Sequence, residues 1–114
     1  MDIHYLEIVT PEVDTVCASY ASLHGVTFSD PEQNLGGART AHFSNGSILG
    51  VRAPMRESEA SVVRHYLRVD DIQASVDAAA AAGAQVALPP MPLPGHGTCA
   101  IVIQGGIETG FWQL

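Results

Sequence analysis

The 114-residue sequence repeats its own pattern when its first half is shifted by 59 residues. In that single ungapped register a helix start, a proline, a glycine and a hairpin turn all coincide. The matched positions are Glu12 with Asp71, Pro31 with Pro90, Gly36 with Gly95, and Gly46 with Gly105. Because each half is too small to bury a sheet face alone, the repeat predicts two similar modules that pack as one domain.

Each module is predicted to contain one strand, one helix and three further short strands, a βαβββ order. In the first module we expect a strand at residues 3–10, a helix from about 13 to 23, and a hairpin at 40–44 and 48–51. The strand alternates apolar and polar side chains, and the helix carries apolar side chains at a 3.6-residue period. Gly25 follows the helix as a C-terminal glycine does, and Asn45-Gly46 is a strong hairpin signal.

A polar connector at residues 53–61 separates the two modules, 1–52 and 62–114. The second module is predicted as a strand at 62–69, a helix to about 82, a strand at 84–88 and a hairpin at 98–103 and 107–114. Asp70-Asp71 are expected to cap the helix start. Residues 89–97 are rich in proline and glycine, which predicts a loop. We expect Glu57 and Glu59 of the connector to be solvated.

Composition limits the possible functions. Twelve acidic side chains against five basic ones give a net charge of −7, which disfavours a nucleic-acid partner because such binding needs clustered cations. All five basic residues are arginine, so lysine Schiff-base chemistry is excluded. No apolar run approaches the roughly 20 residues needed to cross a bilayer, and no signal peptide is visible. Cys17 and Cys99 match no metal-binding spacing and are expected to be reduced, so we predict a cytoplasmic protein without a membrane partner.

Several local motifs add to the repeat. They are Glu7-Ile8-Val9, Ser19-Tyr20, Val69-Asp70-Asp71-Ile72 before an alanine-rich helix, Pro89-Pro90, Pro94-Gly95-His96-Gly97, and the closing Phe111-Trp112-Gln113. With two βαβββ modules over nearly the whole chain, they resemble the vicinal oxygen chelate superfamily, which includes glyoxalase I, bleomycin-resistance proteins, fosfomycin-resistance enzymes and extradiol dioxygenases. The resemblance implies an α+β fold and a single glyoxalase/bleomycin-resistance-like domain over residues 1–114, with curved mixed sheets around a cup-shaped cavity.

The resemblance also raises the question of a metal. Enzymes of this superfamily usually hold a divalent ion through His, Glu or Gln on the first and last strands of each module. The corresponding positions here are Tyr5, Val51, Arg64 and Gly110, with Glu7 two residues after Tyr5. Tyr, Val, Arg and Gly do not form the converging ligand set that such an ion needs. We therefore expect no metal cofactor, and a divalent metal held by ligands at other positions is the alternative.

The strand alternation predicts which side chains line the cup. They are Tyr5, Glu7, Leu49, Val51, Arg64, Tyr66, Arg68 and Trp112. Aromatic and apolar surface with a few polar groups is typical of a small-molecule pocket. We expect Glu7 or a ligand carboxylate to pair with Arg64, because a buried arginine needs a partner. If Glu7 has no close cation, its burial would suit it to act as a catalytic general base.

Three functions remain open from the sequence. The favoured one is a small-molecule-binding protein without metal, which either sequesters its ligand, as bleomycin-resistance proteins do, or acts as a metal-free enzyme. The second is a metal-dependent lyase, isomerase or dioxygenase of the same superfamily. The third is an interaction module in which the sheet serves only assembly. The resemblance further implies a homodimer, and twofold pairing is the commonest oligomer.

Overall fold

A computed structural model describes residues 1–114 and has an α+β fold with two helices and seven strands in mixed parallel and antiparallel pairing. The elements are β1 (Ile3–Val9), α1 (Val13–His24), the 3₁₀ turn η1 (Gln33–Leu35), β2 (Arg39–His42), β3 (Ile48–Arg52), β4 (Val62–Arg68), α2 (Ile72–Ala81), β5 (Gln85–Leu93), β6 (Gly97–Gln104) and β7 (Ile107–Gln113). The chain divides into two compact units: Tyr5–Val63 is the first unit, and Arg64–Leu114 with Met1–His4 is the second. Neither helix is long and apolar enough to cross a bilayer.

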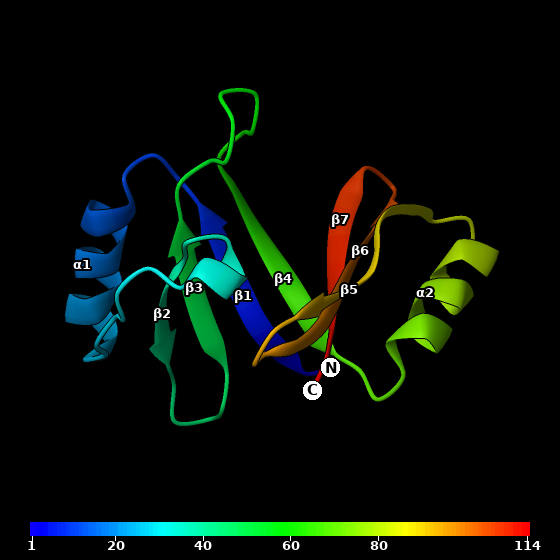
Figure 1. The fold of residues 1–114 in the computed structure, drawn as a ribbon, viewed down its shortest axis with the longest axis horizontal. Helices are drawn as coiled ribbons and strands as arrows, with labels where there is room; N and C mark the ends of the chain where they lie inside the picture. The colour runs from blue at the N-terminus through cyan, green and yellow to red at the C-terminus, as the bar shows by residue number, and fades with distance from the viewer. The chain divides into compact units, whose positions relative to one another are not determined.

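In the first unit, β1 pairs in parallel with β3, and β3 pairs antiparallel with β2 in the predicted hairpin (Figure 1). Helix α1 covers one face of these strands. Its Cys17 packs in a buried apolar cluster with Ile8, Leu49 and Val51. The helix ends at Gly25, whose φ of 66° is the left-handed conformation that glycine adopts at low cost.

The first module departs from the predicted βαβββ order, because two strands rather than three follow its helix. The 3₁₀ turn η1 and an isolated bridge between Glu32 and Ala38 lie where a further strand was expected. Gly36 and Gly37 both have positive φ, a conformation that turns the chain rather than extending it. The segment between α1 and β2 is therefore too strongly bent to add a full strand.

The second unit has the complete βαβββ order. Strand β4 pairs in parallel with β7, β7 pairs antiparallel with β6, and β6 pairs antiparallel with β5. Helix α2 packs on one face of this sheet through Ile72 and Val76, which form a buried cluster with Ala100. As predicted, Asp71 caps the helix, since its carboxylate accepts a hydrogen bond from the Ala74 amide at 3.0 Å.

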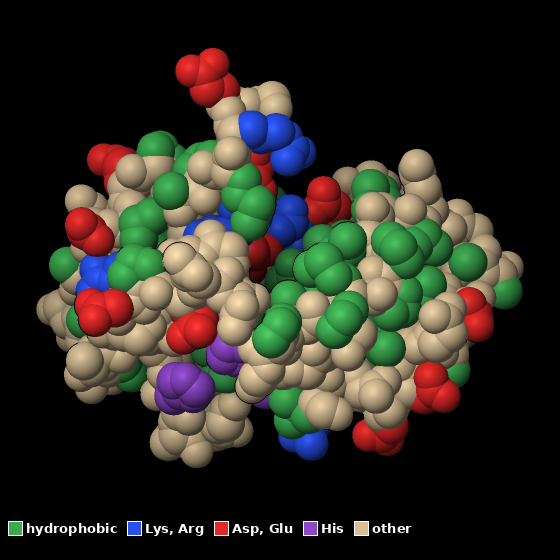
Figure 2. All heavy atoms as spheres, in the orientation of Figure 1, with side chains coloured by type: hydrophobic (Ala, Val, Ile, Leu, Met, Phe, Trp, Pro, Cys, Tyr) green, Lys and Arg blue, Asp and Glu red, His purple; other side chains and the backbone are tan.

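The loop predicted at 89–97 is wrong for its first part, because β5 continues to Leu93. Prolines cannot donate to a strand ladder, but β5 is the last strand of the sheet and pairs only with β6, so a missing donor on its outer side costs little. Two register shifts along β5 absorb the remaining irregularity. The edge strand exposes Val86 and Met91, and Figure 2 shows hydrophobic side chains gathered over it.

Candidate functional site

The strands of the first unit carry different side chains on their two faces. Leu6 and Ile8 of β1 pack with Leu49 and Val51 of β3 against α1. Since successive side chains of a strand alternate and Glu7 is paired with Gly50 in register, the opposite face carries Tyr5, Glu7, Gly50 and Arg52. We call this the polar face of the first unit.

Tyr5 and Glu7 lie on the predicted face, whereas Leu49 and Val51 do not. Val51 is completely buried in the cluster beneath α1, so its side chain belongs to the helix side of the sheet. A shift of one residue in strand register moves every side chain to the other face. The predicted alternation of β3 is therefore wrong by one residue, and the residues that lie on the polar face instead are Gly50 and Arg52.

Arg52 is the centre of the polar face. Its side chain is 6% exposed, and its Nε donates to Oε2 of Glu7 at 2.8 Å. Its Nη1 and Nη2 donate to the two carboxylate oxygens of Glu59 at 2.9 and 2.7 Å, which is the bidentate geometry that suits a guanidinium. Nη1 also donates to the carbonyl oxygen of Ala53. No buried side-chain nitrogen or oxygen of the protein lacks a hydrogen-bond partner, as a stable buried charge cluster requires.

Glu59 is therefore not the solvated residue that the sequence predicted. Its side chain is 14% exposed, and Oε1 also accepts the Met55 amide at 2.7 Å. The hydrogen bonds from Arg52 lower the pKa of the Glu59 carboxyl from 4.5 to about 2. The prediction failed because the charged residues of the connector do not show that its backbone folds back and brings Glu59 onto Arg52 of β3.

The polar face also holds a tyrosine packed over a glycine. The phenol of Tyr5 lies against Gly50, where a Cβ atom would collide with its hydroxyl and ring. Tyr5 is 3% exposed, and its burial, assisted by the negative charge of Glu7, raises its pKa above the ordinary value. Tyr5 is thus a neutral hydrogen-bonding group over the whole physiological pH range.

The second unit presents a similar face. Phe111 of β7 packs with the cluster beneath α2, which places Gly110 and Trp112 on the opposite face by alternation. Pairing of β4 with β7 sets Tyr66 beside Gly110 and Arg68 beside Trp112. The predicted residues Arg64, Tyr66, Arg68 and Trp112 therefore share one face, which we call the polar face of the second unit.

Aromatic contacts fill most of this second face. The rings of Tyr66 and Trp112 meet edge to face with centroids 5.6 Å apart, and the ring of His4 lies 5.5 Å from Trp112. The Trp112 indole donates to the carbonyl oxygen of His96 at 2.9 Å. Tyr66 lies over Gly110 just as Tyr5 lies over Gly50. In both units a glycine on the last strand makes room for a tyrosine from the first.

The two arginines of the second face differ in their surroundings. Arg64 donates from Nε to Oε2 of Glu108 at 2.5 Å, and its side chain is 11% exposed. Arg68 is exposed, and its guanidinium takes part in none of the ion pairs of this unit. An exposed, unpaired guanidinium beside Trp112 is a group that a ligand anion can reach.

The residues at the positions implied for a metal do not fit one. The strand register pairs Glu7 with Gly50 and Tyr66 with Gly110, so the last-strand position of the first unit falls on Gly50 rather than Val51. Two glycines supply no ligand side chain, and Tyr5 is buried as a neutral phenol. No group of three or more His, Cys, Asp or Glu side chains is arranged to hold a metal ion.

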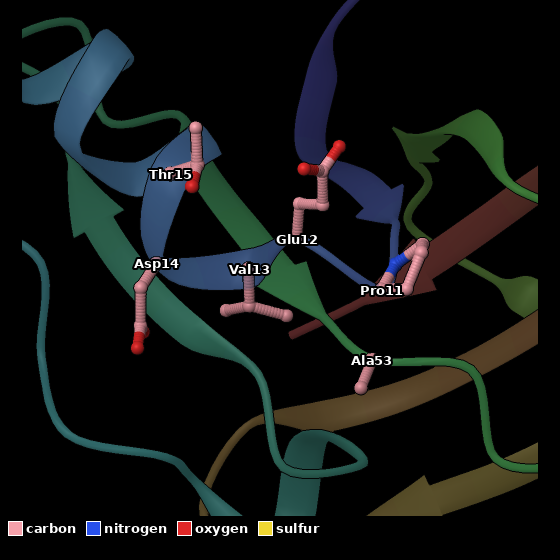
Figure 3. Close-up of a pocket in the computed structure, with 6 residues that line it drawn as sticks. All are labelled: Pro11, Glu12, Val13, Asp14, Thr15 and Ala53. Carbon is pink, nitrogen blue, oxygen red and sulfur yellow. The ribbon is translucent and has the colours of Figure 1, made fainter.

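A shallow depression beside the start of α1 is separate from the polar face. Figure 3 shows the residues that line it, which are Pro11, Glu12, Val13, Asp14, Thr15 and Ala53. Asp14 is engaged with Arg39 at 2.9 Å, and Glu12 makes no side-chain hydrogen bond to cap the helix. None of the predicted site residues lines this depression.

Comparison with solved structures defines the fold. A hypothetical protein from Bacillus halodurans C-125 superposes with a TM-score of 0.77 at 13% identity, covering 99% of this chain and 94% of that one. Methylmalonyl-CoA epimerase from Mycobacterium tuberculosis gives 0.76 at 15% identity over 98% and 87% of the two chains. A Streptomyces coelicolor methylmalonyl-CoA epimerase in complex with 2-nitronate-propionyl-CoA gives 0.75 at 19% identity over 99% and 96%.

These epimerases are members of the superfamily that the sequence motifs resemble. This chain has the vicinal oxygen chelate fold. The match extends over nearly its whole length and confirms the predicted resemblance at the level of fold. No protein-family model matches the sequence, and neither does any curated protein.

Proposed function

We propose that this protein binds a small molecule on the polar faces of its sheets, without the divalent metal that enzymes of this fold usually carry. It either sequesters the ligand or converts it as a metal-free enzyme. The observation that supports this most is the Glu7–Arg52–Glu59 cluster, because charged groups are costly to bury and tend to be kept where they act on a ligand.

Each polar face carries its own residues for a ligand, as predicted except that Arg52 takes the place of Val51. They are Tyr5, Glu7 and Arg52 in the first unit, and Arg64, Tyr66, Arg68 and Trp112 in the second. Tyr5 supplies a hydroxyl, Arg68 an exposed cation, and Tyr66 and Trp112 an aromatic wall. The predicted pairing of Glu7 with Arg64, and the predicted homodimer, stay predictions.

Glu7 remains the candidate for a catalytic group if the protein is an enzyme. From the sequence, Glu7 was expected to act as a general base only if no cation lay close to it. Glu7 does not meet this condition, because Arg52 Nε lies 2.8 Å from Glu7 Oε2. Arg52 instead fixes the orientation of the carboxylate. We therefore propose that the Glu7 carboxylate accepts a hydrogen bond from a donor group of the ligand and so orients it. Measured turnover of a ligand would make Glu7 the candidate for proton transfer.

The similar epimerase structures suggest which ligands to try first. One is described as bound to methylmalonyl-CoA and another to 2-nitronate-propionyl-CoA, so short acyl-CoA thioesters form one class of probe. Planar aromatic acids form the second class, because of the exposed Arg68 beside Trp112.

The test is a titration of the ¹⁵N-labelled protein with propionyl-CoA, methylmalonyl-CoA and benzoate. We expect at least one probe to shift the amides of β1 and β3, the strands that carry the polar face of the first unit. Glu7→Gln is expected to weaken that binding about tenfold, since one hydrogen-bonded carboxylate is lost. Glu12→Gln, at the depression beside α1, is the matched control and should bind as the wild type does. Shifts confined to α1, or equal affinity in both variants, would place the ligand elsewhere.

A further inference from the structure

We propose that Arg52 is a binding site for a ligand carboxylate, and that Glu59 of the connector occupies this site when no ligand is bound. The inference rests on the proposed function, because it names the chemical group by which the small molecule is held. It also gives the connector, residues 53–61, a role as a strap that must release Arg52 before the ligand binds.

The two carboxylates on Arg52 come from different kinds of structure. Glu7 belongs to β1, which pairs with β3 in the sheet of the first unit, and holds the Nε side of the guanidinium. Glu59 belongs to the connector and takes the Nη1 and Nη2 side with both oxygens. This bidentate arrangement is the one that carboxylates frequently adopt on an arginine. Glu59 therefore stands where the carboxylate of a ligand would stand.

The connector contacts the rest of the first unit mainly through the Glu59 ion pair with Arg52 and through the Met55 side chain, which lies against Gly36. It contains no helix or strand, and most of its residues are exposed. Figure 2 shows it projecting from the first unit, with charged side chains at its tip. Its hydrogen bonds to β3 all come from the Arg52 guanidinium, which bonds Ala53 and Glu59. Within the connector, the Arg56 side chain donates to the Ser58 hydroxyl, and the Arg56 carbonyl oxygen accepts from the Glu59 amide. Release of Glu59 would therefore remove the only ion pair between the connector and β3.

Replacement of Glu59 by a ligand carboxylate conserves the buried interactions. One carboxylate leaves the guanidinium and another takes its hydrogen bonds, so no buried charge is left unpaired. The Glu59 carboxylate becomes solvated in the exposed connector, where a charge costs little. The exchange needs only the competition of two similar groups for the same donors. The apparent affinity of the ligand is its intrinsic affinity multiplied by the fraction of time for which Glu59 leaves the site free.

Acetate is the simplest probe, because it is a carboxylate and nothing more. We would titrate ¹⁵N-labelled full-length protein with sodium acetate and, at equal ionic strength, with sodium chloride, and follow two signals. The Arg52 Nε–H reports on the guanidinium, and the Met55 amide reports on Glu59, to which it donates. In the wild type, acetate is expected to move the Met55 amide towards its position in Glu59→Gln, whereas chloride is not.

Two variants of the same connector sharpen the test. Glu59→Gln removes the competing charge and should bind acetate with a Kd at least about tenfold lower than the wild type. Glu57→Gln is the matched control, since Glu57 is exposed and makes none of the contacts to Arg52, and it should behave as the wild type. Equal acetate affinity in all three proteins, or acetate shifts that leave Arg52 and Met55 unmoved, would overturn the proposal.

Failure of this inference and failure of the proposed function give different results. If propionyl-CoA, methylmalonyl-CoA or benzoate binds in a Glu7-dependent way while Arg52 and Met55 stay unmoved, the protein is a ligand binder and the strap is only structural. If acetate exchanges with Glu59 but none of the three probes binds the polar faces, the carboxylate site stands and the proposed function loses its support.

Discussion

Arg52 is the buried charge that organises the polar face of the first unit. It joins β1, β3 and the connector through hydrogen bonds to Glu7, Ala53 and Glu59. A buried arginine is tolerated only when its donors are satisfied, and removal of one partner leaves an uncompensated charge. The same side chain thus fixes the orientation of Glu7 and fastens the strap.

The low pKa of Glu59 predicts a specific pH dependence of stability. Its pKa is about 2 in the folded protein against an ordinary value of 4.5, so between these values the unfolded chain binds more protons than the native one. The free energy of unfolding should therefore rise with pH from about 2 to 4.5, and the contribution of Glu59 is complete above pH 4.5.

Urea unfolding at a series of pH values from 2 to 6 checks this expectation. In Glu59→Gln the rise between pH 2 and 4.5 should be smaller than in the wild type, because the titrating group is gone. Glu57→Gln should keep the wild-type rise. Parallel curves for Glu59→Gln and the wild type would show that the ion pair with Arg52 does not form in solution.

Residue identity alone predicted part of the polar faces. Tyr5 and Glu7 alternate clearly with Leu6 and Ile8, so their face could be read from β1 by itself. The sequence of β3 from Ile48 to Val51 is an unbroken apolar run and contains no such alternation. Arg52 could have corrected the prediction, because an arginine is unfavourable in the apolar contact beneath a helix. Since neighbouring side chains of a strand point to opposite faces, Val51 then belongs on the helix side.

At the scale of elements, each unit joins the first and last strands of its module through a tyrosine and a glycine. Tyr5 covers Gly50 between β1 and β3, and Tyr66 covers Gly110 between β4 and β7. A side chain on either glycine would push the ring out of place. The close pairing of these strands therefore depends on the absence of a Cβ atom.

Gly110→Ala tests this dependence. Its Cβ would meet the ring carbons of Tyr66, and overpacking of this kind costs about 1–3 kcal/mol of stability. Urea unfolding should show that loss in the wild-type background and a smaller loss when Tyr66→Leu is also present, because the ring is then gone. An equal cost in both backgrounds would mean that the ring does not occupy this space.

The elements themselves were mostly predictable. Both helices, the hairpin of the first module and the hairpin of the second follow from periodicity, helix-end glycine and turn residues. The extension of β5 to Leu93 was not predictable. The prolines show that backbone N–H donors are missing, but the sequence does not show that β5 lies at the sheet edge, where the missing donors cost little. The missing third strand of the first module likewise depends on Gly36 and Gly37, whose positive φ is not visible in the sequence.

At the scale of the molecule, the 59-residue repeat predicted the two similar modules of the fold. Its counterpart in space is a pair of units, each with one helix on one sheet face and polar residues on the other. Solved structures at 13 to 19% identity share the fold over nearly the whole chain. The repeat predicts the scaffold, whereas the side chains on the polar faces decide what the scaffold binds.

The proposed function has one central claim, that the protein binds its ligand through these side chains and without a divalent metal. Calorimetric titration of the chelator-stripped protein with Ni²⁺, Zn²⁺, Mn²⁺ and, without oxygen, Fe²⁺ tests it most directly. We expect no tight stoichiometric binding of any of these ions, because the residues at the implied ligand positions are Tyr5, Gly50, Arg64 and Gly110. Tight binding of one ion per chain would contradict the account and would favour a metal-dependent lyase, isomerase or dioxygenase.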